Sequence, residues 1–240
     1  MTGKITSKGG RLLLESKVTG ITSEKMKPLS VICKNSSGTM TVDADYVIST
    51  IPITELADMM NPAISRSTCD KAKELKYRSM IFLFLISGKE KITDNNWIYF
   101  PEKDLIFSRM TEPRNWSAVL APEGKTSLCV EIAVQAFDNT WNSDDSVLFK
   151  KCMAGLEKTG MLNENEVQDY FIVRKRYCYP IYTGNYEEII HQLVTEVESS
   201  GNIVTCGRQG AFKYGNTTDA MISGCEAAEE AFNFFRNMDT

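Results

Sequence analysis

Short apolar segments separated by polar turns dominate the first third of the chain. Three of them have the spacing of strands in a β-meander: Lys17–Ile21, Leu29–Cys33 and Thr39–Val42. Before them, Leu12–Leu14 predicts a strand that follows a glycine pair. After them, Ala44–Pro52 predicts an apolar strand that ends at a proline, which has no N–H to donate to a sheet. Helical patterns follow at Ile53–Met60 and Ser67–Leu75.

The pattern changes at Tyr77, where longer strands begin. Arg78–Ser87 predicts a long buried strand, and Thr126–Ala136 alternates between apolar and polar residues with the period of a strand. Shorter strands are predicted at Trp97–Phe100, Leu105–Ser108 and Val167–Arg176. Amphipathic helices are predicted at Asp144–Lys158, behind a Ser143 cap, and at Tyr186–Ser199. Together these elements indicate a mixed or antiparallel sheet with helices on one side.

The stretch Gly201–Ala231 combines a strand, a glycine turn and a helix start. An apolar strand at Ile203–Cys206 runs into the turn Gly207–Gly210, and a helix begins near Thr217 and Thr218, either of which can act as its N-cap. Such an arrangement brings backbone N–H groups toward an electron-rich ligand. The first and last parts of the chain therefore read as two halves of one nucleotide-binding domain, interrupted by a long β-rich unit.

Composition and charge narrow the classes of function. The chain has 240 residues, of which 42% are apolar, enough to fill a sizeable core. Its 27 basic and 31 acidic residues give a net charge of −4, so nucleic-acid binding is not expected. No apolar run has the length of a membrane span, and the N-terminus lacks the apolar core of a signal peptide. We therefore expect a soluble, cytoplasmic protein.

Cysteine and histidine usage argues against metal and triad chemistry. The seven cysteines are scattered and form no C-x-x-C pair, which favours buried free thiols over a zinc site or a disulfide framework. The one histidine, His191, lies in a helical pattern and is expected at a surface or boundary position. Neither a metal site nor a histidine-based triad is therefore expected.

Several motifs, taken in order along the chain, resemble a superfamily of flavoproteins. Val47–Pro52 together with Gly207–Gly210 is similar to the flavin-containing amine oxidase and protoporphyrinogen oxidase superfamily. The intervening motifs are similar to its UDP-galactopyranose mutase branch: Asn96–Glu102, Phe107–Arg109, Asn115–Ser117, Pro122–Gly124, Tyr179–Pro180 and Gly207–Asn216. The resemblance covers essentially the whole chain.

The resemblance implies an α/β to α+β fold in two domains. Residues 1–76 and 200–240 would form a partial, Rossmann-like FAD-binding domain. Residues 77–199 would form an inserted substrate-binding domain, a mixed or antiparallel β-sheet flanked by helices. The family begins with a G-x-G-x-x-G fingerprint, which this sequence lacks. We therefore expect the C-terminal part of a flavoprotein. FAD is the implied cofactor of the full-length protein, and its retention by this chain alone is an open question.

The resemblance also implies which residues contact FAD. They are Val18, through its backbone to the adenine edge, and Thr50, Pro52, Gly207, Arg208, Asn216, Asp219, Ala220 and Met221. The positive end of the helix that begins near Thr217 would stabilise the negative charge of a reduced flavin by about 0.3–2 kcal/mol. Arg208 has two interpretations, a contact with flavin or substrate phosphate and a structural salt bridge.

Substrate contacts are implied for a second set of residues: Arg109, Asn115, Trp116, Tyr179 and Tyr214. Arg109 ends an apolar strand, where a guanidinium needs an anionic partner. Its planar fork suits the diphosphate of a nucleotide sugar, and the alternative is a pair with a local acid such as Glu131. Trp116 has core packing as its alternative, and the two tyrosines can equally be ordinary half-buried residues.

Two functions from different classes follow. The first is a fragment of an FAD-dependent oxidoreductase or of a UDP-galactopyranose mutase-like enzyme, which isomerises the ring of a nucleotide sugar through reduced flavin. An amine oxidase, protoporphyrinogen oxidase or desaturase would instead keep the flavin elements and replace the phosphate grip with an apolar tunnel. The second is a non-catalytic, truncated domain that binds no FAD alone. No catalytic residue is assigned, the substrate is a nucleotide sugar or other small molecule, and exposed strand edges predict self-association.

Overall fold

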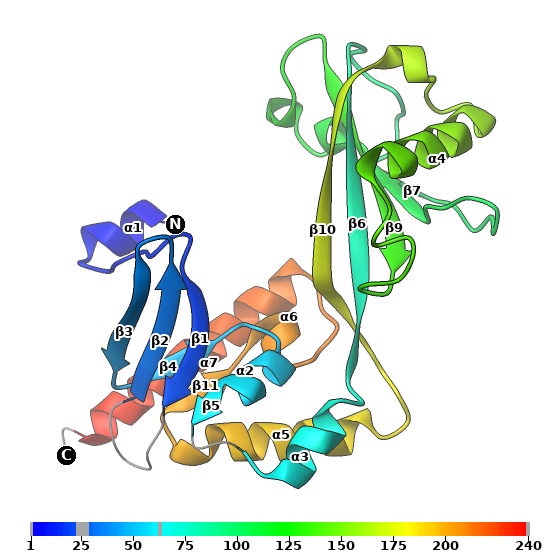
Figure 1. Ribbon diagram of the computed structural model, residues 1–240. Helices are drawn as coiled ribbons and strands as arrows, with labels where there is room; N and C mark the ends of the chain where they lie inside the picture. The colour runs from blue at the N-terminus through cyan, green and yellow to red at the C-terminus, as the bar shows by residue number, and fades with distance from the viewer. Residues whose placement is uncertain (1, 23–28, 62–63, 239–240) are drawn as a thin grey trace. The chain divides into compact units, whose positions relative to one another are not determined.

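The computed structural model describes residues 2–22, 29–61 and 64–238 and divides into two compact units. Unit 1 comprises Met1–Lys76 and Tyr182–Thr240, and unit 2 comprises Tyr77–Ile181 (Figure 1). The sequence pattern predicts the first boundary at the same position but the second one at 199/200. The difference is the helix α5 (Tyr186–Val197), which belongs to unit 1 and not to the inserted unit.

The first sheet of unit 1 contains the expected meander. Its strand order is β3-β2-β1-β5, and the bounds are β1 (Lys17–Thr22), β2 (Leu29–Asn35), β3 (Gly38–Ala44) and β5 (Met60–Asn61). The pairs β1–β2 and β2–β3 are antiparallel, whereas β5 pairs with β1 in parallel. The meander is therefore confirmed, while the turn between β1 and β2 falls on residues 23–28, outside the described part.

A second, two-stranded sheet joins the beginning and the end of the chain. β4 (Val47–Ser49) and β11 (Ile203–Thr205) pair in parallel, with Val47 opposite Ile203 and Ser49 opposite Thr205. The short helix α6 (Gly207–Gly210) and the long helix α7 (Thr217–Met238) follow β11. This pairing makes the two sequence segments parts of one unit, as the pattern predicts.

Three helices complete unit 1: α2 (Ile53–Met59), α3 (Arg66–Ala72) and α5. A short helix α1 (Thr2–Ser7) precedes the meander, and the turn η4 (Glu198–Ser200) follows α5. The side chain of Glu196 on α5 accepts hydrogen bonds from the backbone N–H of Ser65 at 2.8 Å and from its hydroxyl at 2.9 Å. Since Ser65 is the N-cap of α3, this carboxylate fastens the start of α3 to α5.

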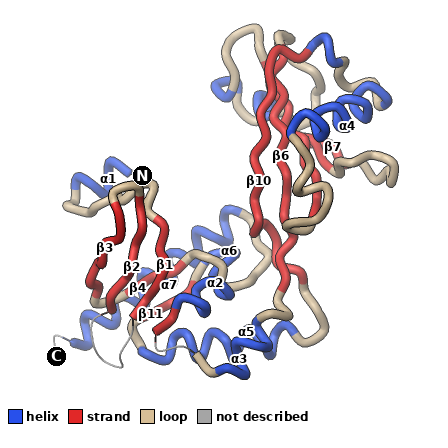
Figure 2. The backbone as a smooth tube through the Cα atoms, in the orientation of Figure 1, coloured by secondary structure: helices blue, strands red, loops and turns tan. Residues whose placement is uncertain are grey.

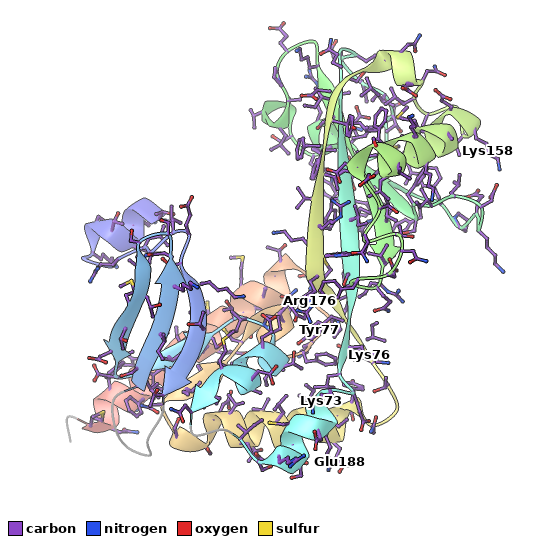
Figure 3. The ribbon with its side chains drawn as sticks, in the orientation of Figure 1. Lys73, Lys76, Tyr77, Lys158, Arg176 and Glu188 are labelled. Carbon is purple, nitrogen blue, oxygen red and sulfur yellow. The ribbon has the colours of Figure 1, made fainter. Side chains whose placement is uncertain are left out.

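Unit 2 is built on a five-stranded sheet in the order β10-β6-β9-β8-β7 (Figures 1 and 2). The bounds are β6 (Lys76–Ser87), β7 (Trp97–Tyr99), β8 (Arg109–Thr111), β9 (Thr126–Val134) and β10 (Val167–Ile181). The β6–β9, β9–β8 and β8–β7 pairs are antiparallel. Tyr77 on β6 and Arg176 on β10 come from neighbouring strands (Figure 3), and Ser79 next to them donates a hydrogen bond to the Arg176 carbonyl at 2.7 Å.

One helix, α4 (Asp145–Lys158), covers one face of this sheet (Figure 1). Its residues Leu148, Cys152 and Leu156 are fully buried in one cluster with Ile81, Leu83 and other alternate residues of the strands. Lys158 in its last turn pairs with Asp104 (Figure 3). The short 3-10 turns η1 (Pro113–Asn115), η2 (Ala118–Leu120) and η3 (Glu164–Glu166) lie in the connections. The other face, away from α4, is called the open face below.

Three local predictions are wrong. Leu12–Leu14 forms no strand, and its side chains are 51%, 41% and 73% exposed, so no neighbouring strand covers them. Leu105–Ser108 is a loop, because Leu105 and Phe107 turn to pack beside Gly155 of α4. The N-cap of α4 is Asp144, whereas the Ser143 hydroxyl donates to the Asn139 carbonyl.

None of the seven cysteines, all of which lie in the described part of the chain, forms a disulfide, and four of them are buried. Cys69 and Cys178 are half-buried and Cys225 is exposed on α7, so the expectation of burial fails at three positions. His191 is exposed on α5, as expected for a surface helix position. Among the helices in the described part of the chain, none is long and apolar enough to cross a bilayer.

Candidate functional site

Strand register places a row of polar side chains across the open face of unit 2. Tyr99 of β7 lies opposite Arg109 of β8, and Arg109 lies opposite Glu131 of β9. Side chains of directly opposed residues on one face of a sheet are close enough to interact. The neighbours Ile98, Met110, Val130 and Ile132 belong to the core beneath α4, so by strand alternation the polar row points away from that helix.

The guanidinium of Arg109 is held from three directions. Its Nη2 donates to Glu131 Oε2 at 2.6 Å and to the hydroxyl of Tyr179, on β10, at 3.3 Å. Its Nη1 donates to the hydroxyl of Tyr99 at 3.4 Å, and its Cζ lies 5.8 Å from the centre of the same ring. These four residues are called the Arg109 cluster. Two predicted substrate residues, Arg109 and Tyr179, thus come together, and the pair with Glu131 that was the alternative interpretation is also present.

The Arg109 cluster combines a buried carboxylate, that of Glu131, with a guanidinium that is partly accessible to solvent, that of Arg109. The side chain of Glu131 is 8% exposed and that of Arg109 is 29% exposed. Burial alone would lower the pKa of Arg109, but the hydrogen bonds that Arg109 donates to Glu131 and to the two tyrosines outweigh it and raise that pKa, so the guanidinium stays charged. Burial also raises the pKa of Cys129, two residues before Glu131, to about 12, which makes that thiol unsuitable as a nucleophile.

Trp116 and Asn115 take different positions near this face. Trp116 is 51% exposed, and its ring lies 4.9 Å from that of Trp97, which is 48% exposed; the core-packing alternative for Trp116 is therefore wrong. The amide of Asn115 donates to the carbonyls of Thr93 and Asn95, at 2.8 Å each. Asn115 thus fastens the loop before β7 instead of pointing a free amide at solvent.

In unit 1, the ends of the two parallel strands bring another group of predicted residues together. Thr50 and Pro52 follow β4, and Gly207 and Arg208 follow β11, so both pairs lie at the carboxyl edge of the same sheet. Gly207 has a φ of +75°, a conformation that favours glycine. The packing is close here, because a Cβ added to Gly210 would lie 2.9 Å from the carbonyl oxygen of Ser49.

The start of α7 is closed by its own side chains. Asn216 Oδ1 accepts hydrogen bonds from the backbone N–H groups of Thr218, at 2.8 Å, and Asp219, at 3.2 Å. Asp219 Oδ2 in turn accepts from the N–H of Asn216 at 2.7 Å. This reciprocal pattern is a capping box, with Asn216 instead of Thr217 or Thr218 as the cap. The backbone N–H groups of Asn216 and Asp219, two residues predicted to contact FAD, thus already have partners.

A hollow of about 290 Å³ lies beside this helix start. Its lining includes Gly207, Arg208, Tyr214, Asp219 and Ala220. Arg208 donates a hydrogen bond to the carbonyl of Gly215, and its Cζ lies 5.5 Å from the centre of the Tyr214 ring, which is a cation–π contact. No heavy atom of the described residues lies within 4 Å of the position that a Cβ on Gly207 would take, so this point is open space.

The remaining predicted residues are distributed over unit 1. Val18 lies on β1 opposite Cys33, next to a bulge at Thr19. Met221, on α7, is 60% exposed, and Tyr214 is 63% exposed. Tyr99 is not among the predicted site residues, although its alternation with Ile98 places it on the open face. It also missed Tyr182, whose hydroxyl accepts a hydrogen bond from the N–H of Tyr214 at 2.6 Å, and no sequence pattern indicates that contact.

Comparison with known proteins identifies the family. A model of the flavin-containing amine oxidoreductases matches residues 3–231. The chain belongs to this family. The resemblance to flavoproteins is thereby confirmed, as is the α/β to α+β fold class.

Three solved structures have a fold similar to that of this chain. A reduced UDP-galactopyranose mutase has a TM-score of 0.79 and 23% identity, with 97% of this chain and 49% of that one covered. A structure provisionally assigned as a protoporphyrinogen oxidase, from Exiguobacterium sp. 255-15, has a TM-score of 0.69 and 19% identity, with 93% and 48% covered. A triple mutant of putrescine oxidase has a TM-score of 0.66 and 15% identity, with 92% and 48% covered. The chain therefore spans about half the length of these structures.

Proposed function

We propose that the chain is the substrate-binding part, with a portion of the flavin-binding part, of an FAD-dependent enzyme that acts on a nucleotide sugar in the manner of UDP-galactopyranose mutase. The observation that carries this proposal is the Arg109 cluster. It presents a charged guanidinium and two tyrosine hydroxyls on an open sheet face. The charge of the guanidinium and the donor capacity of the two hydroxyls suit the oxygens of a diphosphate.

The hollow at the start of α7 fits the ring end of a flavin. Gly207 leaves space for a flat group, and Arg208 supplies a positive charge beside it. The capping box leaves little room for direct hydrogen bonds to the first amides of α7, so the contribution of this helix would be its dipole. A bound FAD would supply the electrons or the nucleophile of the reaction. The chain's own residues would orient the flavin edge and hold the substrate's charged groups.

A second function within the family is favoured by one feature of the same cluster. Glu131 lies 2.6 Å from Arg109 and neutralises much of its charge. A neutral pair is less attractive to a dianion than a lone arginine is. An oxidase-type enzyme that accepts an uncharged or cationic substrate would tolerate this pair. A third possibility, a chain that binds no FAD by itself, rests on the absence of a G-x-G-x-x-G motif from the sequence.

Binding of UDP to the purified chain separates these functions. We expect binding measurable by titration calorimetry, and Arg109→Ala should weaken it by about 1.5–3 kcal/mol, because a charge-assisted contact is lost. Lys103→Ala, an exposed cation elsewhere in unit 2, is the matched control and should bind like wild type. Equal affinities for Arg109→Ala and wild type would show that Arg109 is structural, and a wild-type chain without UDP binding would favour the oxidase-type function.

A flavin titration tests the cofactor. The chain is mixed with FAD, separated by gel filtration, and its absorbance is measured near the flavin bands. Co-elution of flavin, reduced by Arg208→Ala, would support binding at the hollow beside α7. A protein fraction that carries no flavin would support the interpretation that this chain alone does not bind FAD.

A further inference from the structure

Glu131 is an acidic residue that is buried in the sheet of unit 2. Its carboxylate is almost fully buried, and its partner is the guanidinium of Arg109, directly opposite on the neighbouring strand. Burying a carboxylate costs free energy that a single ion pair often fails to repay. A pair of apolar residues of similar volume would stabilise the sheet at least as well. Stability is therefore a weak reason for this pair, and its geometry points to another role.

The geometry fixes the direction of the Arg109 side chain. Arginine has many rotatable bonds, and a free side chain samples many orientations. Here Glu131 takes one Nη2 hydrogen bond, Tyr179 lies at the same nitrogen, and Tyr99 lies at Nη1. The contact with Glu131 is the shortest of the three, at 2.6 Å against 3.3 and 3.4 Å, and it alone involves two charges. Glu131 is thus the main anchor of the guanidinium.

The anchored guanidinium has one more unusual feature. The Nε of Arg109 is buried and has no hydrogen-bond partner among the described residues. An arginine free to rotate would turn this N–H toward water or an acceptor, because an unpaired buried donor costs free energy. The orientation is therefore set by the contacts at the two terminal nitrogens. Part of the side chain, 29% of its surface, remains accessible from the open face.

We propose that Glu131 is a positioning residue, which holds the Arg109 guanidinium in a single orientation so that its accessible edge meets an anionic group of the substrate. This inference rests on the proposed function, in which that group is the diphosphate of a nucleotide sugar. Holding the guanidinium in advance reduces the conformational entropy lost when the anion binds. Tyr99 and Tyr179 assist at the two ends of the fork.

The effect of one substitution on UDP affinity distinguishes a positioning role of Glu131 from a purely electrostatic effect, because the two predict changes in opposite directions. Glu131→Gln removes a negative charge close to the binding edge but keeps a carbonyl oxygen of similar size. Coulombic attraction alone predicts tighter binding of UDP to this variant, because the competing carboxylate is gone. The positioning role predicts weaker binding, by roughly tenfold, because the charge-assisted anchor is lost. Glu90→Gln, which removes the ion pair between Glu90 and Arg114 in the same unit, is the matched control and should leave UDP affinity unchanged.

A double-mutant cycle adds a second criterion. In the Arg109→Ala background, Glu131→Gln should have no further effect on UDP affinity, since Glu131 would act only through Arg109. A carboxylate that merely supports the sheet would change affinity by the same factor in both backgrounds. Unfolding curves for each variant show whether the protein remains folded at the temperature of the titration.

A measurement without ligand completes the test. The Nε–H signal of Arg109 in a ¹⁵N-labelled sample reports the rigidity of its side chain through the heteronuclear NOE. We expect a rigid signal in wild type and a mobile one in Glu131→Gln. An equally rigid Arg109 in the variant, or tighter UDP binding by it, would overturn the proposal. If wild type binds no UDP, the proposed function fails, and the NOE comparison alone decides the positioning role.

Discussion

Two buried glutamates in unit 2 show how surroundings decide the role of the same residue type. Glu112 is fully buried, and its carboxylate accepts hydrogen bonds from the backbone N–H groups of Ile92 and Thr93 and from the Thr126 hydroxyl, at 3.0, 2.8 and 2.7 Å. None of these donors is charged. Glu131 instead faces a charged partner that reaches the surface. Glu112 therefore fastens a loop to the sheet, whereas Glu131 orients a binding group.

Glu112→Gln should destabilise unit 2. The new amide places an N–H₂ group against donors that need an acceptor, so at least one buried N–H or hydroxyl loses its partner. We expect a loss of about 1–3 kcal/mol in the free energy of unfolding. The three tryptophans, Trp97, Trp116 and Trp141, all lie in unit 2, so urea unfolding followed by tryptophan fluorescence reports this unit. Glu123→Gln, at an exposed position, is the control, and an equal midpoint for the two variants would contradict the assignment of Glu112.

At the residue scale, the sequence predicted which residues lie close together better than it predicted what each side chain does. The pair of Arg109 with Glu131 was named as an alternative, because a guanidinium at the end of an apolar strand needs an anionic partner. The hydrogen bonds of Asn115 to a loop twenty residues earlier were not foreseen, since loop paths carry no periodic signal. The capping role of Asn216 was assigned to the following threonines, because asparagine, serine and threonine are similarly good caps.

At the scale of elements, polar contacts fasten α3 to α5 in unit 1. The hydroxyl of Thr68, which is fully buried, donates to Glu196 and accepts a hydrogen bond from Gln192 at 2.7 Å. Burial alone would raise the pKa of Glu196, but the hydrogen bonds from Thr68, Ser65 and Gln192 together lower it below its usual value of 4.5. The carboxylate thus favours the packed state of the two helices only when it is ionised.

This arrangement predicts a pH dependence. Because the folded-state pKa of Glu196 is lowered, its contribution to stability is complete above the usual value of 4.5 and is lost as the pH falls through the lower, folded value. Hydrogen exchange of α3 amides, measured between neutral pH and pH 3 and corrected for intrinsic rates, should therefore show protection that falls at acidic pH.

Glu196→Gln should remove most of this dependence and raise α3 exchange by roughly fivefold or more already at neutral pH, because a charge-assisted hydrogen bond is lost. Glu229→Gln, on the exposed face of α7, is the control. A variant whose protection falls with pH as steeply as that of wild type would show that other carboxylates carry the effect.

The elements were most predictable where the apolar pattern matches a long, regular strand. The strand β6 and the alternating strand β9 lie within two residues of their predicted bounds. Prediction failed where apolar residues serve something other than a strand. Leu105 and Phe107 pack beside the small Gly155 of α4, a contact between residues about fifty positions apart that no local pattern contains. The leucines at 12–14 lie outside any strand and are largely exposed.

At the scale of the whole molecule, the distribution of exposed apolar residues is uneven. The helix α7 carries five large ones: Met221, Ile222, Phe232, Phe235 and Met238. Its buried residue Ala227 packs with Val204 and Cys206 of the segment that includes β11. The small residues Ala220, Gly224 and Ala228 of the same helix are exposed as well. Ile48 on β4 is also 43% exposed. Large exposed apolar patches on soluble domains favour association.

Self-association through α7 is the last prediction. Sedimentation or light scattering of the purified chain should show species larger than a monomer, increasing with concentration, because apolar surface leaves water when two copies meet. Met221→Ser together with Phe232→Ser should reduce these species. Both side chains are at least 60% exposed, so the substitutions remove little packing within the monomer.

Val119→Ser, at an 89% exposed apolar residue of unit 2, is the matched control and should leave the distribution of species unchanged. A monomer at high concentration, or an equal effect of the control, would exclude α7 as the contact surface. The predicted strand edges of unit 1 would then be the remaining candidates, because their unpaired N–H and C=O groups can pair with another chain.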